Sequence, residues 1–272
     1  MNTHHQTNTI KNLVQEIENN GIHGLVHAAT KLYKNEVRSR LNYGDFYGRT
    51  HRATKPLISV DEAIYYSSTF AKEHLDRFNH VLNNLGATIM FAQKLAVIDY
   101  GCGQGLATLA FLNYLQQNNC IANKVIDVHL IEPSAITLAL ARQFVLAMAK
   151  HTQIQVNVSV HQQTLSEYLK NPIIGQSDVI TLHFLSNILD IKAIQSSLIE
   201  LSGYINQQQG QQYICAVSPS YNDDFRNFYQ NLSHFSVDYE RFYVDSHRFN
   251  SNRCVWTHKQ AYGQSLYAQK VA

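Results

Sequence analysis

Three glycines at alternate positions follow a short apolar run, and this spacing indicates a turn where a ligand can touch the main chain. They are Gly101, Gly103 and Gly105, and Asp99 precedes the first of them by two residues. Glycine permits positive φ angles and places no side chain between the backbone and a ligand. A helix beginning near Gln104 would direct its free N–H groups at the same place. The chemistry predicted here is ligand binding by main-chain groups.

The pattern Asp99-x-Gly101-x-Gly103-x-Gly105 resembles the nucleotide-binding turn of class I S-adenosylmethionine (SAM) dependent methyltransferases. In that superfamily an acidic residue at a strand end precedes the glycines by two. A dinucleotide fingerprint, G-x-G-x-x-G, would need a glycine at position 106, where this chain has Leu106. The resemblance implies SAM as the cofactor, with these four residues binding it. A tight turn without a ligand is the alternative.

The elements around the turn follow a repeated strand-helix order. Residues 94–99 form a short apolar run typical of a central parallel strand, and the apolar spacing from 106 to about 116 predicts a helix. Further strands are predicted over 125–131, 154–160, 178–184 and 213–217, with a closing antiparallel pair over 235–242 and 253–258. We therefore predict an α/β, doubly wound, Rossmann-like seven-stranded sheet, six strands parallel and one antiparallel.

An acidic residue, Glu132, ends the second predicted strand and is followed by Pro133 and Ser134. A carboxylate can accept two hydroxyl hydrogen bonds at once, which is what a ribose offers. We predict that Glu132 binds the ribose of the cofactor. The alternative is that it caps the helix expected over 135–150.

The residues after the third and fourth strands are the next candidates. By resemblance, the adenine lies just past the third strand, where Gln162 or Gln163 could accept a hydrogen bond from its amine. Ligands bind beyond the carboxyl ends of parallel strands, so Asn187 is a candidate for orienting the methyl acceptor. His183 is a candidate general base and cofactor contact, or a packed strand histidine. Asp190 is expected to cap the following helix.

Residues 1–90 read as a helical extension or lid. Helices are predicted from Ile10 to about Leu41, interrupted near Gly21, and from Ser59, which can cap, to about Leu85. The loop expected over 42–52 interleaves aromatic and basic residues, which suits a substrate-facing lid or a polyanion contact, or only a solvated face. By resemblance Tyr66 covers the cofactor near its sulfonium and is a candidate catalytic residue; core packing is the alternative.

Composition excludes several classes of protein. The chain has 272 residues and a formal charge of +2, so charge does not imply a nucleic-acid partner. The four cysteines form no C-x-x-C pair, and neither a metal site nor a disulfide framework is expected. No signal core or membrane-length apolar run is present, and we expect a cytoplasmic protein.

The sequence thus predicts a lid over 1–90, a SAM-binding domain over 91–261 and a tail over 262–272. The expected function is methyl transfer to an acceptor, and a small molecule is favoured over RNA or protein. A non-catalytic SAM-fold binding protein and an NAD-dependent oxidoreductase are the alternatives from other classes.

Overall fold

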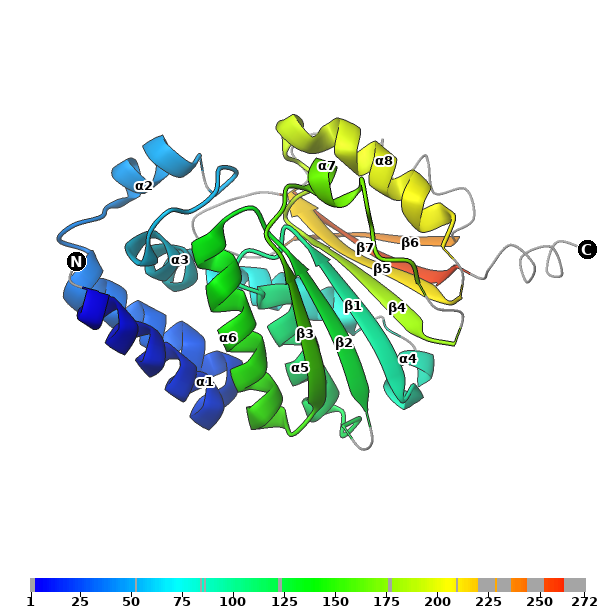
Figure 1. Cartoon of the computed structure of the whole chain (residues 1–272), viewed down its shortest axis with the longest axis horizontal. Coiled ribbons are helices and arrows are strands. Elements are labelled where there is room, and N and C mark those ends of the chain that lie inside the picture. Colours follow the sequence, from blue (N-terminus) through cyan, green and yellow to red (C-terminus); the bar gives the residue numbers. More distant parts are fainter. Residues whose placement is uncertain are drawn as a thin grey trace, which may run out of the picture.

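A central seven-stranded sheet organises the fold (Figure 1). The computed structural model describes residues 3–51, 53–83, 85, 87–121, 124–175, 178–208, 210–219, 228, 236–243 and 252–261. The strand order is β3-β2-β1-β4-β5-β7-β6. The first five in this order run parallel, whereas β7 lies antiparallel to both β5 and β6. The strands are β1 Lys94–Tyr100, β2 Val125–Ile131, β3 Gln155–His161, β4 Ile180–Ser186, β5 Gln212–Pro219, β6 Ser236–Tyr243 and β7 Asn252–Ala261.

The predicted α/β, Rossmann-like class with a parallel sheet covered by helices is confirmed. The five parallel strands begin and end within about two residues of the predicted bounds. β1 and β2 are rich in Val, Ile and Leu because both faces of these strands are covered.

Helices cover the two faces of the sheet unequally (Figure 1). One face packs against α3 Val60–Leu82, α5 Leu106–Gln117 and α6 Ala135–Thr152, and α1 Thr3–Leu32 lies outside this layer, against α3 and α6. The other packs against α7 Leu165–Tyr168 and α8 Gln195–Asn206. The remaining helical segments are the π-helix η1 Tyr33–Val37, α2 Tyr43–Thr50, α4 Ala87–Phe91 and the short η2 Lys192–Ile194. Among the described residues, no helix is long and apolar enough to cross a membrane.

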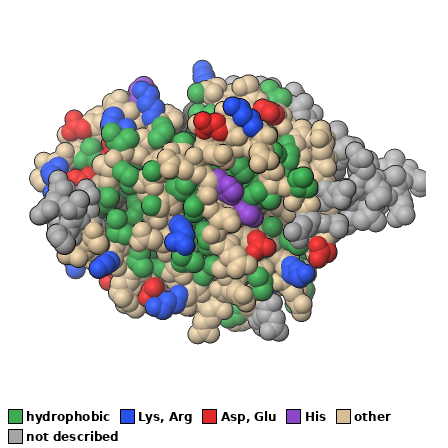
Figure 2. Space-filling view, in the orientation of Figure 1, with side chains coloured by type: hydrophobic (Ala, Val, Ile, Leu, Met, Phe, Trp, Pro, Cys, Tyr) green, Lys and Arg blue, Asp and Glu red, His purple; other side chains and the backbone are tan. Residues whose placement is uncertain are grey.

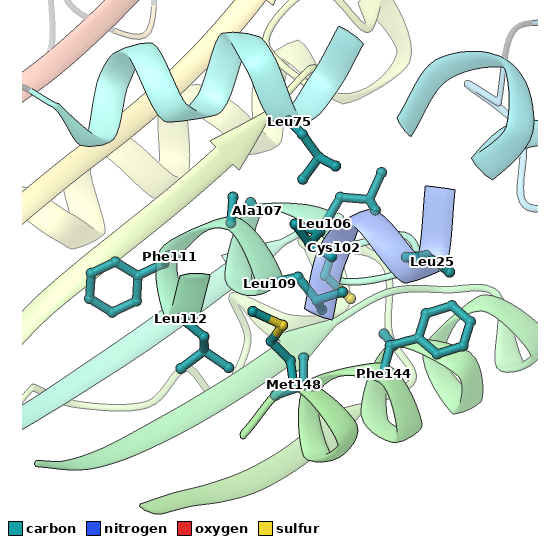
Figure 3. Close-up of a cluster of buried hydrophobic side chains, with 14 of the residues drawn as sticks. Leu25, Leu75, Cys102, Leu106, Ala107, Leu109, Phe111, Leu112, Phe144 and Met148 are labelled. Atoms are coloured by element: carbon teal, nitrogen blue, oxygen red, sulfur yellow. The ribbon is translucent and has the colours of Figure 1, made fainter. Parts of the chain in front are cut away.

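The predicted lid shares one apolar core with the rest of the fold. Figure 3 shows Leu25 of α1 and Leu75 of α3 meeting Leu109 of α5 and Phe144 of α6 in a single cluster. Cys102, from the glycine-rich turn, points into the same cluster and is 8% exposed. Burial of these side chains, at roughly 1.5–3 kcal/mol for a large aliphatic or aromatic residue, therefore ties the helices before the sheet to the turn.

The structure corrects the prediction made for residues 42–52. These residues were expected to form a loop, yet most of them form α2. The Asn42 side chain accepts a hydrogen bond from the Asp45 N–H at 3.1 Å, which caps the helix, and Phe46 is 1% exposed. The sequence also predicts a helix around 223–232, and all of this range except residue 228 lies outside the described residues, as does the tail over 262–272.

Asp190 was expected to cap the helix after β4, and this prediction is wrong. The next helical segments, η2 and α8, begin after Ile191 and Ile194, neither of which makes a side-chain cap. Asp190 lies earlier, in the turn that follows β4, and is partly buried.

Helix α1 bends at Gly21, whose φ of 61° and ψ of −148° are not helical. A Cβ at this position would lie 2.9 Å from Nε2 of His151, and the His151 Nδ1 lies 3.1 Å from the carbonyl oxygen of Glu18 just before the bend. Lys150 also pairs with the Glu18 carboxylate at 2.6 Å. The bend is therefore held against the end of α6.

Gly21→Ala should lower the free energy of unfolding by about 1–3 kcal/mol, because alanine is strained at positive φ and its Cβ would press on the His151 ring. Urea denaturation followed by circular dichroism measures the change. Gly48→Ala is the matched control, since a Cβ there meets nothing within 4 Å and alanine favours the helix. Equal or greater stability of Gly21→Ala would contradict the role assigned to the bend.

Candidate functional site

The glycine-rich turn connects β1 to α5, and all three glycines need positive φ angles. These are 60° at Gly101, 52° at Gly103 and 75° at Gly105, which is also the N-cap of α5. A Cβ at Gly101 would lie 3.0 Å from Ile188, and one at Gly105 would lie 3.3 Å from Val145. A Cβ at Gly103 would meet nothing within 4 Å. Gly101 and Gly105 therefore also serve packing, whereas Gly103 borders open space.

The carboxylate of Glu132, at the end of β2, is directed at this turn. Its Oε2 accepts a hydrogen bond from the Gly103 N–H at 3.1 Å, and its Oε1 accepts one from the Ser134 N–H at 2.9 Å. Burial raises the pKa of Glu132, and these backbone hydrogen bonds oppose the rise. Ser134, whose hydroxyl accepts from the Thr137 N–H, is the N-cap of α6. Since each carboxylate oxygen has two lone pairs, Glu132 keeps acceptor capacity for a ligand.

Asp99, the next-to-last residue of β1, is 1% exposed. Its Oδ2 accepts a hydrogen bond from the Thr108 hydroxyl at 2.7 Å, whereas its Oδ1 is buried and has no hydrogen-bond partner among the described residues. Burial raises the pKa of Asp99 to about 7, and the charge of Glu132 adds to the rise. An unpartnered buried oxygen beside the turn is a place for a donor group from a ligand.

Helix α3 is fastened directly onto the turn by Gln104, which is 2% exposed. Its Nε2 donates to the carbonyl oxygen of Ala63 at 2.9 Å, and its Oε1 accepts from the Ser67 hydroxyl at 2.5 Å. The segment before α3 is fastened too, because the Ser134 hydroxyl donates to the carbonyl oxygen of Leu57 at 2.5 Å. Residues 57–67 therefore lie against the carboxyl ends of β1 and β2. This segment, together with the rest of α3, is here called the roof.

Tyr66, on this roof, pairs with His74. The Tyr66 hydroxyl lies 3.1 Å from Nδ1 of His74, and both side chains are partly exposed. Burial raises the pKa of Tyr66, and the carboxylates of Glu132 and Asp190 raise it further. Burial lowers the pKa of His74 to about 4, so both groups are neutral near pH 7. The effect of Glu132 and Asp190 on the pKa of Tyr66 indicates that these three side chains lie around one region.

Asn187, just after β4, has a φ of 59°, which is uncommon for a residue other than glycine. Its N–H donates to the carbonyl oxygen of Val217 at 2.7 Å, and its Oδ1 accepts from Nη1 of Arg77 at 3.4 Å. Arg77 comes from α3, is 3% exposed and forms an ion pair with Glu73. Asparagine adopts a positive φ more readily than most residues, and the contacts from Val217 and Arg77 fix the position of this residue.

The structure corrects the prediction that His183 is a general base or a cofactor contact. His183 is 0% exposed, in the middle of β4, on the face that packs against α8. Its Nδ1 lies 3.0 Å from the Tyr100 hydroxyl, and its Nε2 lies 2.8 Å from the Gln212 Oε1. Burial lowers its pKa to about 4. With both ring nitrogens bonded inside the core, it is a packed strand histidine.

Gln162 and Gln163 follow β3, which lies beside β2. Gln162 is exposed, and Gln163 is partly buried and donates its N–H to the carbonyl oxygen of His161 at 2.9 Å. That same carbonyl accepts a hydrogen bond from the Glu132 N–H at 3.1 Å, so the two loops are joined. Which amide would contact an adenine stays a prediction.

Three residues that take part in this region were missed by the sequence analysis: Gln104, His74 and Arg77. The spacing of 66, 70, 74 and 77 on one helix face was the available signal for the last two. Among the described residues no group of His, Cys, Asp or Glu could hold a metal ion. A hollow of about 60 Å³ beside Ala96 and His129 lies nearer the amino ends of the strands, away from the glycine-rich turn.

Comparisons with known proteins identify similar solved structures at low sequence identity. No family model and no curated protein matches the sequence. Similar solved structures include a candidate class I SAM-dependent methyltransferase from Listeria monocytogenes, with a TM-score of 0.44 and 11% identity over 93% of this chain and 88% of that chain. Geranyl diphosphate C-methyltransferase from Streptomyces coelicolor, solved with S-adenosyl-L-homocysteine, has a TM-score of 0.42 and 10% identity over 77% of this chain and 84% of that chain. Because these TM-scores are below 0.5, the proposals that follow rest on the residues of this chain.

Proposed function

We propose that the chain is a SAM-dependent methyltransferase of class I and that the cofactor binds at the carboxyl edge of β1 and β2. The observation that carries this proposal is the bond from the Gly103 N–H to Glu132 at 3.1 Å, with open space beside Gly103. It brings the glycine-rich turn and the acidic end of β2 together, as a nucleoside-binding site requires. The antiparallel pairing of β7 with β5 and β6 supports the proposal, because the resemblance leads us to expect a closing antiparallel pair.

The residues present fit the charge and hydrogen-bonding groups of SAM. Glu132 offers acceptor capacity for ribose hydroxyls, and Asp99 offers its unpartnered Oδ1 to a donor group. Glu132 and Asp190 place negative charge near Tyr66, which favours a cation beside its ring. When bound, SAM supplies a methyl group activated by a positively charged sulfur.

The protein's own contribution is alignment and the exclusion of water. The roof is held to the turn by Gln104, and the proposed role of Asn187, which Arg77 contacts, is to orient the acceptor. We favour a small molecule as the acceptor, and methylation of RNA or protein is the alternative. Tyr66 and His74 are the candidates for holding the acceptor's proton.

Calorimetric titration with S-adenosylhomocysteine tests the cofactor assignment. We expect binding by the full chain, and Gly103→Ala should weaken it at least about tenfold, because a methyl group there occupies the open space and strains a positive φ. Gly203→Ala is the matched control, since its Cβ also meets nothing within 4 Å but lies on α8.

Absence of binding, or equal binding by Gly103→Ala, would contradict the proposal. Binding of NAD in place of S-adenosylhomocysteine would favour the oxidoreductase alternative. Binding with no S-adenosylhomocysteine released from SAM over a broad acceptor panel would favour the non-catalytic one.

A further inference from the structure

Residues 31–55, here called the basic lid, carry an excess of positive charge that is not apparent from the net charge of the whole chain. They contain seven Lys or Arg and two Asp or Glu, whereas the other residues contain fifteen and eighteen. The formal charge is therefore +5 on the basic lid and −3 on the remainder. Figure 2 shows Lys and Arg side chains spread over this face of the molecule, some of them near α2. This asymmetry predicts attraction of a polyanion to one side of the molecule.

Several of these cations are available to a ligand. Arg40 pairs with Asp61 at 2.9 Å, and Arg49 pairs with Glu62. Lys31, Lys34 and Arg38 are exposed, as is Lys55, and none of them has an ion pair within the part of the chain that the structure describes. Pairing thus fixes the fold of the basic lid and leaves a set of solvated cations along η1 and the loop after α2.

The same segment exposes a row of aromatic rings. Tyr43 and Tyr47 are 48% and 44% exposed and stack with their centroids 5.8 Å apart and their planes at 24°. Tyr47 stacks in turn on His51, at 6.3 Å and 14°. Their spacing of four residues places all three on one side of α2, while Phe46 and Thr50 are buried on the other. If the rings of Tyr43 and Tyr47 served only to pack the core, they would be buried.

We infer that the basic lid binds single-stranded nucleic acid. Its free cations would neutralise backbone phosphates, and its row of rings offers stacking surfaces for bases, which is how proteins hold single strands without reading sequence. An acidic peptide would use the cations but not the rings. A duplex hides its base faces and would use only the charge.

The basic lid is connected to the edge of the sheet where the cofactor is proposed to bind. Arg49 donates to the carbonyl oxygen of Pro56 at 3.2 Å, and Leu57 next to it accepts the hydrogen bond from Ser134. A single-stranded nucleic acid bound on α2 would therefore lie near the carboxyl end of β2. The inference concerns binding alone and does not rest on methyl transfer.

Fluorescence anisotropy with a labelled, unstructured single-stranded RNA tests it, using the full chain at low and moderate salt. We expect a dissociation constant on the order of 10⁻⁶ to 10⁻⁴ M near physiological salt. Lys34→Gln combined with Arg38→Gln should weaken binding about tenfold and reduce the slope of log affinity against log salt by about 1.4. Tyr43→Ala combined with Tyr47→Ala should also weaken binding about tenfold, with the salt slope unchanged.

The controls remove the same groups elsewhere on the surface. Lys170→Gln with Lys192→Gln removes two exposed cations, and Phe91→Ala removes a ring that is 80% exposed. Both should bind RNA as the parent does. Polyglutamate, an acidic peptide, is titrated in parallel and should bind more weakly than RNA. The inference would be overturned by any of three results: lid variants that bind RNA as tightly as the controls do, polyglutamate that binds as tightly as RNA, or no RNA binding at low salt. S-adenosylhomocysteine titration of the lid variants keeps the two proposals separate, since it should be unchanged.

Discussion

Replacing Glu132 by glutamine should weaken S-adenosylhomocysteine binding about a hundredfold while the protein stays folded. Hydrogen bonds to a charged acceptor contribute roughly 1.5–3 kcal/mol each, and a factor of ten in affinity is about 1.4 kcal/mol. A glutamine keeps one oxygen for the Gly103 N–H or the Ser134 N–H but loses the charge and half of the acceptor sites. Calorimetric titration measures the affinity, and thermal denaturation without ligand measures the fold.

Glu132→Ala separates the structural role from the binding role. Removing the carboxylate leaves two backbone N–H groups without their acceptor, at about 1–3 kcal/mol each where they are buried, so stability should fall as well as affinity. Glu167→Gln is the control, because this carboxylate also accepts a backbone N–H, from Thr164, but lies exposed at α7. If Glu132→Gln bound the ligand as the parent does, the carboxylate would serve only to hold the turn.

The parts of the fold that could be predicted from sequence are those set by local patterns. The strand before Gly101 and the helix after Gly105 follow from apolar runs with the right lengths, and the three glycines mark the turn between them. The position of Glu132 follows because parallel strands end at a common edge. These inferences needed no knowledge of which residues touch across the fold.

The rest depends on contacts between distant segments. Gln104 looked like a spacer between glycines, and only the folded chain shows it bonded to Ala63 and Ser67, about 40 residues earlier. His183 has the type and place of a catalytic residue, but its role is decided by Tyr100 and Gln212 on the strands beside it. A one-residue alternation decides which face of β4 a side chain occupies, and the sequence of the strand does not say which face borders the site.

Asp99→Asn should gain stability relative to the parent as the pH rises, and the gain should be largest above pH 7. The pKa of Asp99 is about 7 in the folded protein and 3.8 is its ordinary value, because burial disfavours the charge. Between these values the folded protein holds a proton that the unfolded chain has released. The stability contributed by this group is therefore complete below about pH 4 and is lost as the pH rises through about 7. The full change is roughly 4 kcal/mol.

Urea denaturation of the parent and of Asp99→Asn from about pH 5 to pH 8 measures this difference. Asparagine keeps an oxygen for the Thr108 hydroxyl, so the fold at low pH should be little changed. Asp178→Asn is the matched control, since that carboxylate is largely exposed beside Lys94 and should leave the pH profile of the parent intact.

The informative quantity is the stability of the parent relative to Asp99→Asn, because His74 and His183, with pKa values of about 4, make both proteins more stable as the pH rises toward 6.5. If this relative stability does not fall between about pH 5 and pH 8, Asp99 is ionised throughout. Burial would then be offset by hydration or by a donor to its Oδ1. If this relative fall is observed, the charged form of Asp99 destabilises the folded protein. A destabilising carboxylate at the turn is expected where a ligand, rather than the protein, supplies the hydrogen-bond donor that Oδ1 of Asp99 lacks.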